Sequence, residues 1–158
     1  VKSAQTGACL DLLGDSAGPS NLSLALRGCD YGSARQQWAI DASSGFARNL
    51  GSGLCLDVVG HPGRKEGSRI GVQTCAWSKS PDLTDQRWTF APGGQVRSRL
   101  SGDCLNQRPG PGGAAPSLEL RACGPENGTN ASTWNFVGLE QAATLRGLAH
   151  GRSEAALG

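Results

Sequence analysis

Cysteine is the residue type whose spacing most directly predicts chemistry in this sequence. The chain has six, in successive pairs separated by 20, 20 and 19 residues: Cys9 and Cys29, Cys55 and Cys75, and Cys104 and Cys123. Three loops of nearly equal length favour disulfide bonding within each pair over the other possible connectivities. A metal site would need closer cysteines or nearby histidines, and the only histidines are His61 and His150. We therefore expect three disulfides, no metal and an oxidising compartment.

Sequence patterns that would indicate an enzyme are absent. The chain has no G-x-S-x-G elbow, no glycine-rich phosphate loop and no metal-ligand spacing. The sequence contains three repeats, described below. Aspartates from different repeats are not expected to act as a glycosidase pair, which needs carboxyl groups within about 10 Å of each other. We expect no catalysis and no cofactor.

Composition points to a single β-rich domain. The 158 residues include 24 Gly and 8 Pro, which favours short strands joined by turns. Fifteen Lys and Arg against 13 Asp and Glu leave a net charge of +2 with no basic block, so a nucleic-acid partner is not expected. No apolar run is long enough to cross a bilayer, and we expect no membrane insertion of this segment.

The cysteines stand in a repeated sequence context that predicts strands. The first cysteines of the pairs are 46 and 49 residues apart, and their surroundings are G-A-C-L-D at 7–11, G-L-C-L-D at 53–57 and G-D-C-L-N at 102–106. Apolar residues two positions apart precede the second cysteines, which indicates strands with one buried face. These residues are Leu24 and Leu26, Ile70 and Val72, and Leu118 and Leu120.

Each repeat has a tryptophan near its C-terminal end. Trp38, Trp88 and Trp134 are each followed two positions later by a second apolar residue, again on one face of a strand. Three units of this size cannot bury their apolar faces alone and must share a core. We expect the three rings near a pseudo-threefold axis, with repeats at about 1–46, 47–95 and 96–137.

These residues together resemble a known family. Three Cys-Leu-Asp-type strands, each followed by a second cysteine and then by a Gln-x-Trp-type strand, are similar to the ricin-type β-trefoil, also called the R-type lectin or carbohydrate-binding module family 13. The resemblance covers residues 1–137 and implies an all-β trefoil with three intra-repeat disulfides. Residues 138–158 lack the pattern and are expected to form a tail, either a short helix over 139–149 or a linker.

The resemblance also implies a sugar pocket in each repeat. In this family the Asp of Cys-Leu-Asp accepts hydrogen bonds from two sugar hydroxyls, and the Gln of Gln-x-Trp supports that Asp. The first two repeats keep both residues: Asp11 with Gln36, and Asp57 with Gln86. The third has Asn106 and Ser132, and an amide cannot accept at both of its terminal atoms, so this pocket is expected to be degenerate. The alternative for the two aspartates is a simple role in capping turns.

The position that usually stacks on the sugar, two residues before the second cysteine, is not aromatic in this chain. It holds Arg27, Gln73 and Arg121, whose alternation with buried neighbours directs them away from the core. Tyr31 and Trp77, two residues after the second cysteine, could supply a displaced platform or could pack over the disulfides.

Charged residues refine the expected sites. Arg27 and Arg35 at the first site would suit an anionic sugar, unless Arg27 only pairs with a surface carboxylate. The second repeat has the longest loop after its second cysteine, with Asp85 directly before Gln86. It is therefore the best predicted site, with His61 in the facing turn and these members: Asp57, Trp77, Asp85 and Gln86.

Three sequons, at Asn21, Asn127 and Asn130, agree with an extracellular or secretory-pathway location. Because the chain opens at Val1 without Met, we expect it to be part of a larger precursor. The predicted function is noncatalytic carbohydrate binding, with glycans, glycoproteins and other domains of the parent protein as partners. The alternative is a trefoil that has lost sugar binding and serves as a protein-interaction or spacer module.

Overall fold

The computed structural model describes residues 1–14, 22–60, 65–79, 84–91, 93–124 and 133–136. These residues form short strands with two single-turn 3₁₀ helices. In chain order the elements are β1 (Lys2–Ser3), β2 (Cys9–Leu13), β3 (Ser23–Arg27), η2 (Ala34–Gln36), β4 (Trp38–Ile40), β5 (Ala47–Asn49), β6 (Cys55–Val58), β7 (Ile70–Gln73), β8 (Trp88–Phe90), β9 (Val96–Ser98), β10 (Cys104–Arg108), η4 (Pro111–Gly113), β11 (Ser117–Arg121) and β12 (Trp134–Asn135).

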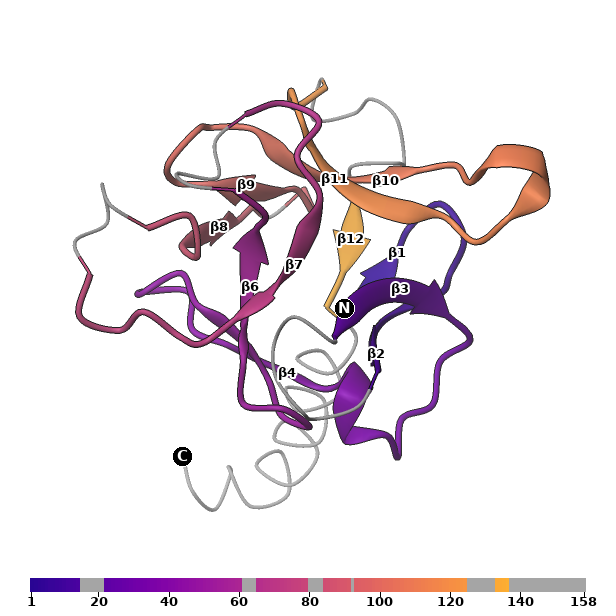
Figure 1. The fold of residues 1–158 in the computed structure, drawn as a ribbon, viewed down its shortest axis with the longest axis horizontal. Coiled ribbons are helices and arrows are strands. Elements are labelled where there is room, and N and C mark those ends of the chain that lie inside the picture. Colours follow the sequence, from indigo (N-terminus) through magenta and orange to yellow (C-terminus); the bar gives the residue numbers. More distant parts are fainter. Residues whose placement is uncertain (15–21, 61–64, 80–83, 92, 125–132, 137–158) are drawn as a thin grey trace, which may run out of the picture.

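The strands form three antiparallel four-stranded sheets that repeat one plan. Their orders are β12-β1-β2-β3, β4-β5-β6-β7 and β8-β9-β10-β11. Each sheet combines the hairpin that begins at the first cysteine of one repeat with the tryptophan strand of the preceding repeat. The first repeat takes this strand from the third, because β12 pairs with β1. The three hairpins lie around a common centre (Figure 1). The structure confirms the predicted β-trefoil.

The core lies where the three sheets meet. It combines the leucines of the Cys-Leu-Asp-type strands, the apolar residues before the second cysteines and the tryptophans. Trp88 and Trp134 are fully buried, whereas Trp38 is half-buried. Each indole N–H donates to the carbonyl of the leucine after the first cysteine of its own repeat: Leu10, Leu56 and Leu105, at 3.1, 3.2 and 3.1 Å. A buried ring therefore also satisfies its polar atom.

Disulfides and glycines fix the turns that flank each hairpin. The three predicted cysteine pairs are bonded, with Cα atoms 5.0, 5.0 and 5.1 Å apart. Gly7, Gly53 and Gly102, each two residues before a first cysteine, have φ of 74°, 75° and 82°. Glycine adopts this left-handed conformation without steric cost, which explains why it recurs at this position.

Several predictions fall on residues outside the described part of the chain. These are the three sequon asparagines, Asn21, Asn127 and Asn130, as well as His61, Ser132 and the helix over 139–149. Within the described part, no helix has the length and apolar character needed to cross a bilayer.

Candidate functional site

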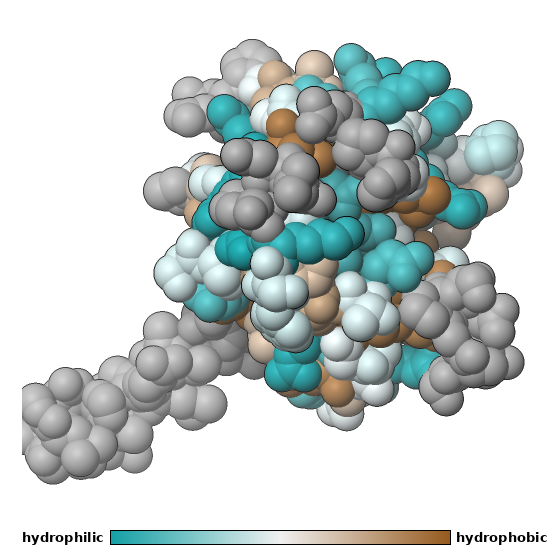
Figure 2. Space-filling view, turned by 60° about the vertical axis from the view of Figure 1, so that its left-hand side comes forward, coloured by the Kyte–Doolittle hydropathy of each residue, from teal (hydrophilic) through white to brown (hydrophobic). Residues whose placement is uncertain are grey.

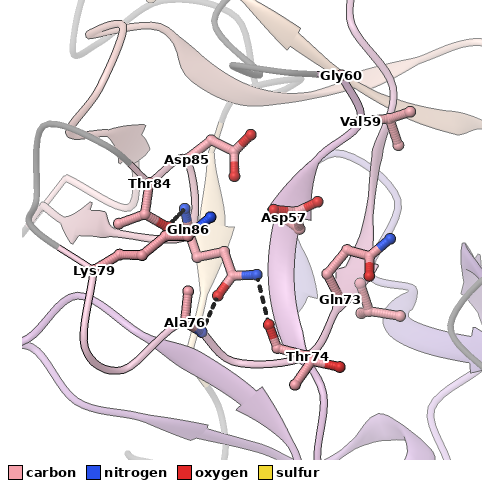
Figure 3. Close-up of a pocket in the computed structure, with 11 residues that line it drawn as sticks. Asp57, Val59, Gly60, Gln73, Thr74, Ala76, Lys79, Thr84, Asp85 and Gln86 are labelled. Carbon is pink, nitrogen blue, oxygen red and sulfur yellow. Dashed lines mark hydrogen bonds between the residues drawn. The ribbon is translucent and has the colours of Figure 1, made fainter.

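The second repeat forms a cavity of about 360 Å³ beside the β6–β7 hairpin. Asp57, on β6, lies at its centre and is 9% exposed. The far wall comes from the loop that leads to β8, and it brings Lys79, Thr84, Asp85 and Gln86 to the same cavity (Figure 3). The structure therefore brings together three of the four residues predicted for this site: Asp57, Asp85 and Gln86.

Gln86 holds the cavity in shape. It is buried, its Oε1 accepts from the backbone N–H of Ala76 at 2.8 Å, and its Nε2 donates to the carbonyl of Thr74 at 3.0 Å. These two residues flank Cys75, so the side chain ties the loop to the disulfide-bonded end of β7. Thr84 accepts from the Gln86 backbone N–H at 3.2 Å and orders the residues just before it.

Asp57 and Asp85 interact through their side chains. Burial and the neighbouring Asp85 carboxyl group raise the pKa of Asp57 to about 8, while a hydrogen bond from Gln86 and the charge of Lys79 act in the opposite direction. Burial raises it because a charge in a poorly solvated place is unfavourable, and two like charges in contact repel. At neutral pH Asp57 therefore keeps its proton.

The first repeat has a smaller version of the same site. A cavity of about 270 Å³ is lined by Asp11, Arg27, Gly28, Asp30, Ser33 and Gln36. Gln36 repeats the contacts of Gln86: its Oε1 accepts from the Asp30 N–H at 2.7 Å, and its Nε2 donates to the Gly28 carbonyl at 3.1 Å. It also donates to Asp11 Oδ2 at 3.3 Å.

Three predicted residues lie outside these two linings. Arg35 donates from Nη1 to the carbonyls of Leu12 and Gly14, at 3.2 and 2.6 Å, so its guanidinium is held at the end of β2. Trp77 packs on Phe46 with ring centroids 4.7 Å apart, and it is 58% exposed. Tyr31 is exposed and also does not line the first cavity.

In the third repeat the residue equivalent to Asp57 is hydrogen-bonded to a buried acid of its own hairpin. Asn106 on β10 is paired in register with Glu119 on β11, which is only 5% exposed. Arg121 donates to Glu119 Oε1 from Nε and Nη2, at 3.1 and 2.8 Å, and Asn106 donates to the same oxygen at 3.4 Å. The two open sites have small residues at the register position of Glu119: Ala25 opposite Asp11 and Gly71 opposite Asp57.

Sequence reasoning missed this register position and also Lys79. The signal was present, because the residue four positions before each second cysteine is Ala25, Gly71 or Glu119. A large acidic side chain there, next to the arginine of the stacking position, indicates that a repeat has closed its own cavity.

In the face shown in Figure 2, hydrophobic residues form small patches separated by hydrophilic ones. Among the described residues, no cluster of three His, Cys, Asp or Glu side chains could hold a metal ion.

Comparison with known proteins gives a family and a fold. A family model described as the ricin-type beta-trefoil lectin domain matches residues 1–134. No relative was found among curated proteins. Among solved structures, the chain is similar to the mdaA-1 domain, with 21% identity, a TM-score of 0.72 and coverage of 85% of both chains.

Two further structures illustrate the range of the fold. The C-terminal domain of an earthworm lectin, a mutant in complex with 6'-sialyllactose, is 17% identical with a TM-score of 0.63, over 84% of this chain and 91% of that one. The designed threefold-symmetric protein ThreeFoil is 17% identical with a TM-score of 0.65, over 85% of this chain and 93% of that one. At these identities the similarity shows the fold alone.

Proposed function

Since this chain belongs to the ricin-type β-trefoil lectin domain family, we propose that it binds glycans without catalysis, chiefly through the cavity around Asp57. The observation that carries the proposal is a buried Asp57, in contact with Asp85 and Gln86, at the centre of an open cavity. Asp11, Arg27 and Gln36 form a second, smaller site. The third repeat contributes none, because Glu119 and Arg121 occupy its place.

The polar side chains of this cavity suit a sugar. Hydroxyl groups both donate and accept hydrogen bonds. The carboxyl groups of Asp57 and Asp85 supply acceptors to a ring with neighbouring hydroxyls. Lys79 and Gln73 add donors at the rim.

The same pair argues against a glycosidase. Enzymes of that kind hold their two carboxyl groups about 5 to 10 Å apart, so that the scissile bond fits between them. The side chains of Asp57 and Asp85 instead interact directly with each other.

A preference for anionic glycans rests on Arg27 at the first cavity and Lys79 at the second. Arg35, which sequence reasoning placed beside Arg27, is engaged by backbone carbonyls and does not add to it. The earthworm lectin domain in complex with 6'-sialyllactose makes a sialylated ligand a reasonable first probe. The three disulfides fit an extracellular or secretory-pathway location, which we also propose.

A glycan array with the disulfide-bonded domain tests the proposal. Three variants change equivalent positions: Asp11→Ala, Asp57→Ala and Asn106→Ala. We expect binding to sugars, including sialylated or sulfated ones, that Asp57→Ala removes, that Asp11→Ala weakens and that Asn106→Ala leaves unchanged. A blank array from folded protein would contradict the proposal and would favour the protein-interaction module, for which the exposed Trp77 is the observed feature.

A further inference from the structure

A second cavity lies next to the Asp57 cavity and is not explained by the site described above. It has a volume of about 410 Å³ and is formed where the hairpins of all three repeats approach one another. Val59, Val72 and Gln73 line both cavities, so the two are contiguous. The remaining wall of the second cavity comes from Leu22, Ser23, Leu24, Arg69, Ile70, Gly71, Ser117 and Leu118.

Gly71 lines the second cavity next to the residues that the two cavities share. Gly71 is the register partner of Asp57, and a Cβ built on it would lie 3.3 Å from Cγ2 of Val59. Any larger side chain would therefore fill the space beside Val59. In the third repeat the same register position holds Glu119, which fills the equivalent place.

The second cavity offers more apolar surface than the Asp57 cavity does, although Arg69 and three other polar residues also line it. Leu22 and Leu24 are half-buried at its wall, and Val59, at the boundary, is 43% exposed. The Asp57 cavity, by contrast, is lined mainly by carboxyl, amide, hydroxyl and ammonium groups. Ligand sites commonly combine an apolar surface with a few polar groups that fix orientation.

We propose that the second cavity binds an apolar group attached to the sugar that Asp57 holds, so that the ligand class is an alkyl-type glycoside or a glycolipid head with the start of its hydrocarbon chain. This inference rests on the proposed function, because the sugar must first occupy the Asp57 cavity. The apolar group then passes over Gly71 and contacts Val59, Leu22 and Leu24.

Paired glycosides test the subsite. Methyl and n-butyl β-glycosides of galactose, xylose and N-acetylgalactosamine are titrated into the isotope-labelled domain, and NMR shifts give both affinity and location. For the sugar that binds, we expect the butyl glycoside to bind about tenfold more tightly, the gain from burying roughly half of the added chain. Methyl resonances of Leu22 and Leu24 should move only with the butyl glycoside.

One variant and one control separate this inference from the proposed function. Leu22→Asn makes the wall of the second cavity polar and should bring the butyl-to-methyl affinity ratio close to one. Leu22→Asn should not change the affinity for the methyl glycoside. Leu50→Asn changes a leucine that is 46% exposed and lines neither cavity, and it should keep the tenfold ratio.

The outcomes distinguish two failures. If a methyl glycoside binds in an Asp57-dependent way and the butyl glycoside is no tighter, or if Leu22→Asn keeps the ratio, the subsite is wrong and the proposed function stands. If neither a methyl glycoside nor any glycan of the array, sialylated and sulfated ones included, perturbs the residues around Asp57, the proposed function fails and the subsite fails with it.

Discussion

Asp11 and Asp57 occupy equivalent positions in two repeats, yet their neighbours differ in kind. The residue just before the supporting glutamine is Arg35 in the first repeat and Asp85 in the second. Arg35 is held by backbone carbonyls, whereas Asp85 turns to Asp57 and shares a hydrogen bond with it. The residue just before the supporting glutamine therefore decides whether the central aspartate has a second carboxyl group beside it.

The acid pair makes stability depend on pH. In the folded protein Asp57 keeps its proton up to about pH 8, whereas an aspartate in the unfolded chain releases its proton near pH 4, about its ordinary pKa. Between these values folding takes up a proton, so the free energy of unfolding should fall as pH rises from about 4 to about 8. Asp57→Asn cannot titrate and should flatten this slope.

Urea unfolding at about pH 5 and about pH 8 measures the effect. The variant should gain stability relative to the wild type as the pH rises. Parallel pH profiles for the two proteins would show that Asp57 is ionised throughout this range and would contradict the assigned proton.

The two supporting glutamines should differ in their contribution to stability. Gln86 is buried and Gln36 is half-buried, although both make the same two backbone hydrogen bonds. Removing a buried partner leaves polar groups without water, at a cost of about 1–3 kcal/mol. Gln86→Ala should therefore lower the free energy of unfolding by roughly this amount, and Gln36→Ala by less. Chemical denaturation of both variants checks this, and a larger loss for Gln36→Ala would be inconsistent with the burial.

At the residue scale, repeat comparison predicted which side chains gather but not where the aromatic rings go. Asp57, Asp85 and Gln86 follow from their places relative to the cysteines and tryptophans. Trp77 instead packs on Phe46, and Arg35 donates a hydrogen bond to a backbone carbonyl at the end of β2. Those partners come from other segments, which the pattern of a single repeat does not specify.

At the element scale, the register of each hairpin decides whether its cavity is open. Ala25, Gly71 and Glu119 face the central Asp or Asn of their hairpins. A small residue on the second strand leaves space above the carboxylate, whereas Glu119 with Arg121 takes that space. The strands were predictable from the alternating apolar residues. The role of the residue between the two apolar positions was not predictable in this way, because it does not belong to the core pattern.

A large polar side chain, like that of Glu119 in the third repeat, can be introduced at the same register position of the other two repeats. Gly71→Gln should place a side chain beside Asp57, its register partner, and reduce glycan binding in the Asp57 cavity. The domain should stay folded, because the backbone at Gly71 does not require glycine. Ala25→Gln should close only the first cavity. Binding measured for both variants against the same glycan, with circular dichroism as the folding control, decides the matter. Unchanged binding in Gly71→Gln would show that the sugar does not lie above Asp57.

At the scale of the whole molecule, the three repeats share one core and one cyclic connection of strands. Each tryptophan strand adds to the sheet of the next repeat, and β12 returns to β1. The sequence predicted this sharing because no repeat could bury its apolar face alone. It did not predict that Trp38 would be less buried than Trp88 and Trp134, since the three positions are equivalent in the repeat.

This difference should appear in stability. Trp88→Ala removes a fully buried ring and its hydrogen bond to Leu56, and it should cost about 3–5 kcal/mol. Trp38→Ala should cost less, because its ring is half-buried. Thermal or urea unfolding of the two variants, with the disulfides intact, provides the comparison. Equal losses would mean that Trp38 and Trp88 contribute equally to the core and would contradict the difference in burial.

The central claim is that a glycan lies in the cavity of the second repeat, against Asp57. The most direct measurement is an amide-shift NMR titration of the domain with a soluble glycan that binds on the array. The account predicts that the largest shifts fall on Asp57, Ala76 and Gln86, with smaller ones around Asp11 and Gln36 and none around Asn106 and Glu119. Saturable shifts that gather instead at the third repeat, or around Trp77 and Tyr31 with Asp57 unaffected, would contradict it.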